Sequence, residues 1–252
     1  MSNPRWMRAS LTAVMAGAVA TGAHALTAEQ VYAKVSPSVW RVVTYDADNL
    51  PLGQGSGVVV GTEALVTNCH VLARAKRVAV KRDKESYEAK LALWDVKRDV
   101  CQLRVTGLKA PAVVVADSAR VSVGQNVFAI GNPKGLELTM SAGLVSSLRR
   151  NEAGQLVLIQ TSAAISGGSS GGGLFDAQGM LVGLTTIGSV GVDTQNLNFA
   201  IPSDWVRELP QRHAAAAASA ASRNATATPA SGATAVGADS ARTFQQSTDS
   251  PP

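Results

Sequence analysis

The stretch GGSSGGGLFD, residues 167–176, places glycines on both sides of a pair of serines. A serine nucleophile needs an exposed hydroxyl and free backbone N–H groups that bind the developing oxyanion. Glycine allows the backbone conformations that turn such groups inward. Ser170 is therefore the candidate nucleophile, and the N–H groups of Gly168 and Ser170 are the candidate oxyanion donors. A flexible glycine–serine linker is the alternative, and the apolar strand-like segments on both sides disfavour it.

The candidate base is His70, because His24 and His213 lie in the two end segments. Taken alone, His70 fits a structural histidine; together with Ser170 it fits the group that takes the serine proton. A buried carboxylate should orient the imidazole. Asp99 opens the strand-like segment DVCQLRV, which would hold it rigidly. The other aspartates considered between the base and the nucleophile are Asp83, Asp95 and Asp117.

The same glycine-rich stretch, as GSSGG at 168–172, also fits the G-x-S-x-G nucleophile elbow of α/β-hydrolases. That motif needs a helix after the serine, with the acid and then the histidine further along the chain. Here glycines and apolar strand-like runs follow, and the only later histidine is His213. A lipase or esterase is therefore not expected.

Short apolar runs of strand length recur through residues 36–202, separated by Gly, Asp, Asn or Pro. This spacing predicts an all-β barrel or sandwich. The segment 106–124 has the character of a linker between two β lobes of similar size. Helices are expected at 27–35 and at 203–209, the second with Ser203 as its N-cap, and the alanines that follow could extend it.

The chain ends differ from the folded part. Residues 1–25 combine Arg5 and Arg8, a short apolar run and a small-x-small site at 23–25, which predicts a cleaved secretory signal and export to the periplasm or the exterior. A membrane anchor is disfavoured, because a span needs about 20 apolar residues.

Residues 213–252 are rich in Ala, Ser, Thr and Pro and predict a disordered tail. The formal net charge is +5, and two of these charges belong to the signal segment. The remainder is spread along the chain, so no nucleic-acid partner is expected.

Five segments carry a family resemblance. They are TNCHV (67–71), DVCQL (99–103), GNP (131–133), GSSGG (168–172) and FAIP (199–202). In this order they resemble the trypsin-like serine proteases of the HtrA (Do-like) type. The resemblance covers nearly all of residues 26–210. It places the histidine at His70, the aspartate at Asp99 and the nucleophile at Ser170.

The resemblance implies two six-stranded antiparallel β-barrels with the active site between them. The protease domain would span 26–212, with the first barrel at about 36–108 and the second at about 120–202. It implies a serine endopeptidase of unfolded or extended polypeptides that needs no cofactor or metal. The family tends toward trimers, which implies a homo-oligomer. Family members usually carry PDZ domains, and no such segment follows here.

The resemblance also implies a specificity pocket with Ala164 at its base and Ile165 beside it, which favours cleavage after small or medium aliphatic residues. Substrate would pair as an extra strand, because main-chain pairing gives affinity without sequence choice. The residues of the pairing edge are Thr185, Thr186, Ile187 and Gly188.

Three further features depart from the family pattern: Cys69 before the histidine, Ser169 before the nucleophile, and a short loop at 44–55. Since the triad brings His70 and Asp99 together, Cys69 and Cys101 must be neighbours, and export would allow a disulfide. Two separate buried thiols are the alternative. A second alternative concerns function: a catalytically silent barrel fold that acts as a binding or chaperone module.

Overall fold

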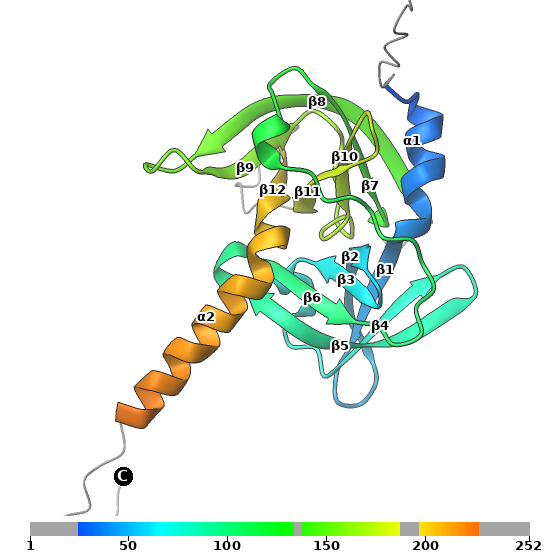
Figure 1. The fold of residues 1–252 in the computed structure, drawn as a ribbon. Helices are drawn as coiled ribbons and strands as arrows, with labels where there is room; N and C mark the ends of the chain where they lie inside the picture. Colours follow the sequence, from blue (N-terminus) through cyan, green and yellow to red (C-terminus); the bar gives the residue numbers. More distant parts are fainter. Residues whose placement is uncertain (1–24, 134–137, 187–196, 227–252) are drawn as a thin grey trace, which may run out of the picture. The chain divides into compact units, whose positions relative to one another are not determined.

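The computed structural model describes residues 25–133, 138–186 and 197–226. The predicted signal segment, apart from its last residue, and the tail after residue 226 lie outside the described residues, as do Ile187 and Gly188. Figure 1 shows two β-barrels, one formed by the N-terminal strands and one by the later strands. The two six-stranded antiparallel barrels predicted above are confirmed.

The first barrel closes in the order β1-β2-β3-β6-β5-β4. Alternating residues of its strands fill its interior, including Val42, Leu65, Val80 and Leu103. Its strands are β1 (Val39–Tyr45), β2 (Pro51–Gly61), β3 (Ala64–Thr67), β4 (Arg77–Arg82), β5 (Glu85–Asp95) and β6 (Val100–Arg104).

The second barrel closes in the order β10-β11-β12-β9-β8-β7. Its interior includes Val127, Val145, Ile159 and Leu174. Its strands are β7 (Asn126–Gly131), β8 (Thr139–Arg150), β9 (Leu156–Thr161), β10 (Gly173–Asp176), β11 (Leu181–Thr186) and β12 (Asn198–Pro202).

A third apolar cluster joins the two barrels. Val58 and Val100 of the first barrel share it with Phe128 and Phe175 of the second. Helix α1 (Ala28–Val35) adds Val31 and Val35 to this cluster, and its start is fixed by a capping box between Thr27 and Gln30. The barrels are therefore held by continuous apolar packing, which fixes the residues that each contributes to a shared site.

Short 3₁₀ turns in the described part of the chain lie between the longer elements. They are η1 (Ser36–Ser38), η2 (Cys69–Leu72), η3 (Val96–Arg98) and η4 (Ser118–Arg120). Two of them matter for function, because η2 contains His70 and η3 ends at Asp99.

Helix α2 (Asp204–Thr226) is longer than the helix expected at 203–209, and the part of the predicted tail from 213 to 226 is helical. The alanine run after residue 213 explains the extension, since alanine has the highest helix propensity. Ser203 precedes the helix, and its carbonyl accepts from the Val206 and Arg207 N–H groups. Its hydroxyl donates to the Ala116 carbonyl and accepts no backbone N–H of the helix among the described residues. Within the described ranges, none of the helices has the length and apolar character that a membrane crossing requires.

Candidate active site

His70 and Asp99 are joined by two hydrogen bonds. Asp99 Oδ2 lies 2.7 Å from His70 Nδ1, and Asp99 Oδ1 accepts from the His70 backbone N–H at 2.9 Å. The carboxylate thus fixes both the imidazole and the start of the turn that carries it. Asp99 itself has a left-handed backbone, with φ 56° and ψ 38°, which places its side chain at the end of η3. Such a conformation is uncommon for residues other than glycine.

The other aspartates considered from the sequence have different partners. Asp83 pairs with Arg82 on the surface, Asp95 accepts from the Arg98 N–H, and Asp117 accepts from the Ala119 N–H. Of the four, Asp99 is the one that contacts His70 in the described structure.

The predicted disulfide between Cys69 and Cys101 is confirmed. It links the residue before His70 to the second residue after Asp99, with 5.0 Å between the Cα atoms. Two further contacts join the same segments: Asn68 Nδ2 donates to the Asp99 carbonyl at 3.0 Å, and the Cys69 N–H donates to it at 3.4 Å. The histidine and aspartate segments are therefore connected covalently as well as by hydrogen bonds.

The loop that carries Ser170 is held by Ser56, a fully buried residue of β2 in the other barrel. The Ser56 N–H donates to the Ser170 carbonyl at 2.8 Å, and its hydroxyl donates to the Gly168 carbonyl at 2.9 Å. The same hydroxyl accepts from the Asn132 N–H at 2.8 Å. Sequence reasoning missed Ser56; the signal that could have found it is a serine between two glycines, GSG at 55–57.

Glycines give this loop its shape. Gly168 and Gly171 have φ values of 93° and 82°, in the region that disfavours residues with a Cβ atom. Ser169 and Gly171 donate their N–H groups to the Ser166 and Thr185 carbonyls. Within the described residues, the N–H groups of Gly168 and Ser170 donate to no acceptor. These two donors therefore remain available for an oxyanion.

His70 and Ser170 line one surface pocket of about 300 Å³ together with Gly168. In the part of the chain that the structure describes, the Ser170 hydroxyl forms no hydrogen bond, including none to His70. Catalytic hydrogen bonds often tighten only when substrate binds. The remaining lining residues are Thr44, Leu52, Gly53, Gln54, Val71, Ala73 and Arg74.

Residues 55–184 match the family of the trypsin-like peptidase domain, a range that contains His70, Asp99 and Ser170. Curated relatives that resemble the chain include a Do-like protease and DegQ, and solved structures that resemble it include an HtrA-type protease. The chain belongs to the HtrA-type trypsin-like peptidases.

Three relatives illustrate the relationship of this HtrA-type peptidase to curated proteins. Protease Do-like 1, chloroplastic, from Arabidopsis thaliana is 39% identical over 174 residues, 65% of this chain and 40% of the relative. The periplasmic pH-dependent serine endoprotease DegQ of Escherichia coli (strain K12) is 36% identical over 168 residues, 64% of this chain and 37% of the relative. The mitochondrial serine protease HTRA2 of Bos taurus is 37% identical over 177 residues, 67% of this chain and 38% of the relative.

Among solved structures, the HtrA-type protease AlgW with a tripeptide is 34% identical to this chain, with a TM-score of 0.64. The match covers 72% of this chain and 61% of that one. The HtrA-type peptidase described here spans about two fifths of the length of the curated relatives that it matches.

A second, smaller pocket of about 110 Å³ lies beside the loop that carries Ser170. Ala164, the predicted base of the specificity pocket, and Thr185, from the predicted pairing edge, both line it. Ile165 packs instead against the core of the second barrel. The other lining residues are Ala129, Ile130, Gly131, Pro133, Thr139, Ser141, Ser166 and Ser169.

Thr185 also helps to order the nucleophile loop. Its N–H donates to the Gly172 carbonyl, and its own carbonyl accepts from the Gly171 N–H, both at 2.8 Å. Its hydroxyl donates to the Ser169 carbonyl at 2.6 Å. Thr186 is buried at the end of β11 opposite Phe199. The backbone N–H and carbonyl of Thr185 thus both bond to the Ser170 loop. Ile187 and Gly188 of the predicted pairing edge lie outside the described residues.

Replacing Gly171 with alanine is expected to lower thermal stability and block covalent labelling of Ser170 by a fluorophosphonate probe. The new Cβ atom would lie 2.2 Å from both the Ser56 carbonyl oxygen and Thr67 Oγ1. The left-handed backbone adds a further penalty of about 1–2 kcal/mol. The matched control is Gly154→Ala, where φ is 75° but a Cβ atom meets nothing within 4 Å. Equal behaviour of the two variants would show that the close approach is unimportant.

Proposed function

We propose that this protein is a serine endopeptidase with His70, Asp99 and Ser170 as its catalytic residues. The main support is the doubly hydrogen-bonded His70–Asp99 pair, whose His70 lines the same pocket as Ser170. Ser170 attacks the peptide carbonyl, and His70 accepts the serine proton. His70 then delivers that proton to the leaving amine, while Asp99 stabilises the imidazolium. Water then attacks the acyl-enzyme ester and gives a proton to His70. Cleavage of the ester bond returns this proton to the Ser170 oxygen and releases the second product.

The N–H groups of Gly168 and Ser170 would bind the oxyanion of each tetrahedral intermediate. Their support is that neither has an acceptor within the described residues. Loss of one such donor typically raises the barrier by about 3–4 kcal/mol. Ser56 holds the carbonyls of Gly168 and Ser170. The Thr185 hydroxyl holds the Ser169 carbonyl, which shares a peptide plane with the Ser170 N–H and so orients that donor.

Labelling of the folded protein with a fluorophosphonate probe tests this function. Wild type is expected to form a stoichiometric adduct on Ser170, and Ser170→Ala is expected to form none. Ser169→Ala is the matched control. The Ser169 hydroxyl has no hydrogen bond among the described residues, and the variant still has the Ser170 hydroxyl. A folded wild type that takes up no probe would support the alternative, a silent barrel that acts as a binding module.

The small pocket supports cleavage after Ala, Val, Ile or Leu. Among the described residues, its lining has no charged side chain, and its volume of about 110 Å³ is below the roughly 150 Å³ of a cavity that accepts benzene. Ala164→Ile would fill part of it. We expect this variant to lower kcat/KM about 10–200-fold for substrates with Leu before the scissile bond, and much less for those with Ala. Cleavage-site profiling checks this, and a wild-type profile dominated by Lys or Arg would contradict it.

We propose further that the substrates are unfolded or extended segments and that the protein is exported. A disulfide persists best in an oxidising compartment, which supports export. The curated relative DegQ carries the description periplasmic. Mass spectrometry of the mature protein should find Leu26 as its first residue. Cleavage of a disulfide-bonded test protein should accelerate after its reduction and unfolding, and equal rates would count against the preference for unfolded chains.

A further inference from the structure

The turn that carries Asp99 has its own support within the first barrel. Asp95 ends β5, and its Oδ1 atom accepts from the Arg98 N–H, which closes η3. Asp99 follows with its left-handed backbone. A strained conformation of this kind persists only where the surroundings determine it. The position of the carboxylate beside His70 therefore depends on what holds residues 95–98.

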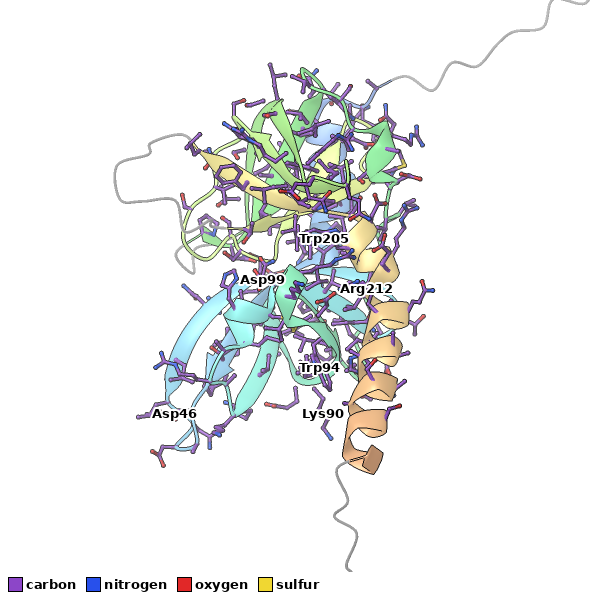
Figure 2. All side chains as sticks on the ribbon, turned by 90° about the vertical axis from the view of Figure 1, so that its left-hand side faces the viewer. Asp46, Lys90, Trp94, Asp99, Trp205 and Arg212 are labelled. Carbon is purple, nitrogen blue, oxygen red and sulfur yellow. A yellow bond between two sulfur atoms is a disulfide. The ribbon has the colours of Figure 1, made fainter. Side chains whose placement is uncertain are left out.

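Helix α2 contacts both charged residues of this turn. Arg212 Nε donates to the second carboxylate oxygen of Asp95 at 2.5 Å, and only 11% of the Asp95 side chain is exposed. Arg98 donates to the Glu208 carboxylate, and its guanidinium lies 5.0 Å from the centre of the Trp205 ring. Figure 2 shows Trp205 and Arg212 along the side of α2 that borders the first barrel. Partly buried charge pairs are screened less than exposed ones.

An aromatic contact adds a third connection. The rings of Trp94, in β5, and His213 meet edge to face with centroids 4.2 Å apart. Trp94 lies opposite Cys101 in the β5–β6 ladder, and Asp95 lies opposite Val100, so this contact reaches the hairpin that carries Asp99. The contacting residues of the helix, at 205, 208, 212 and 213, follow the spacing of a single helical face.

The start of α2 is itself fixed to the rest of the domain. Val206 and Leu209 are buried in the cluster that joins the barrels. Asp204 accepts hydrogen bonds from the backbone and hydroxyl of Ser118, and it pairs with Arg207. Burial raises the pKa of Asp204, but the Ser118 and Arg207 hydrogen bonds outweigh it and leave this pKa below its usual value. The start of α2 is thus held in place, so its contacts can restrain the position of the turn at 95–98.

We propose that Glu208 and Arg212 of α2 are positioning residues for Asp99. They act through Arg98 and Asp95 to hold η3, and so keep the carboxylate on His70. The expected effect on catalysis rests on the proposed function. The expected effect on the position of Asp99 does not depend on that function. A consequence is that the C-terminal helix and the reaction centre are energetically coupled.

The test compares Glu208→Ala/Arg212→Ala with wild type by two measurements. The first is hydrogen exchange of the His70 backbone N–H, which Asp99 Oδ1 accepts. We expect exchange to accelerate about tenfold in the double variant. The second is peptide hydrolysis, where we expect kcat to fall about tenfold with KM unchanged. Glu208→Gln/Arg212→Lys keeps hydrogen-bonding partners for the turn. This variant should therefore have a His70 exchange rate and a kcat close to those of wild type.

Gln211→Ala is the matched control, because Gln211 lies on the same helix, is exposed, and its side chain forms no hydrogen bond among the described residues. It truncates a neighbouring side chain without touching η3 or the anchored start of α2, so His70 exchange and kcat should stay near wild type. Unchanged His70 exchange in the double variant, or equal acceleration in Gln211→Ala, would overturn the positioning role. Absent hydrolysis and labelling in wild type would overturn the proposed function alone, since the exchange measurement still decides the positioning role.

Discussion

Asp99→Asn is expected to lower kcat for peptide hydrolysis by about 10⁴-fold, the size seen when a serine protease triad loses its carboxylate. The carboxylate here accepts two bonds at once, one from the His70 backbone N–H and one from Nδ1. An asparagine has a single oxygen. If that oxygen serves the backbone N–H, its amide group faces Nδ1 and donates to it. The imidazole then carries its proton on Nε2 and cannot accept the Ser170 proton.

Single-turnover hydrolysis and fluorophosphonate labelling measure this effect. Asp83→Asn provides the control, because Asp83 is an exposed partner of Arg82 and does not contact His70. Thermal unfolding should change little in either variant, since asparagine fills the same space. Near wild-type turnover in Asp99→Asn would remove Asp99 from the mechanism.

Removing the disulfide is expected to destabilise the folded state by about 3–4 kcal/mol. The bridge joins residues separated by 32 positions, and in the chain-entropy model a closed loop of this size has about that effect. For a domain of this length, the shift corresponds to a fall in unfolding temperature of the order of 10 °C. Labelling of Ser170 should also slow, because the bridge ties the His70 segment to the Asp99 segment.

Calorimetry of Cys69→Ala/Cys101→Ala measures the loss. Reductant should lower the unfolding temperature of wild type toward that of the double variant, and it should leave the double variant unchanged. Alkylation after denaturation without reductant should modify neither cysteine of wild type. Free thiols in that experiment would contradict the bridge.

The elements that the sequence predicted well are those with strong local signals. The apolar runs and the turn residues between them predicted an all-β barrel or sandwich with two lobes. The number of strands in each barrel followed only from the family resemblance that the five ordered motifs carry. The pairing of Cys69 with Cys101 followed once His70 and Asp99 were placed together. These inferences needed only short-range patterns and one long-range assumption.

Other features depend on packing between distant segments. Ser56 is an ordinary strand residue in the sequence, and its role arises only because β2 lies against the Ser170 loop of the other barrel. The sequence suggested Ile165 as a wall of the specificity pocket, whereas in the structure its partly buried side chain packs against the core of the second barrel. The length of α2 could be judged from its alanines, yet the contacts of Glu208 and Arg212 with residues 95–98 could not.

The hydrogen bonds of Ser56 also bear on when, during folding, the Ser170 loop becomes ordered. Ser56 belongs to the first barrel, whereas the Gly168 and Ser170 carbonyls that it holds belong to the second. These bonds can form only when the two barrels lie against each other, so a partly folded chain has an unsupported Ser170 loop. We therefore expect the proposed hydrolytic activity to arise only at the last step of folding. An extended chain that has not finished folding would then not be cut by other partly folded copies of this protein.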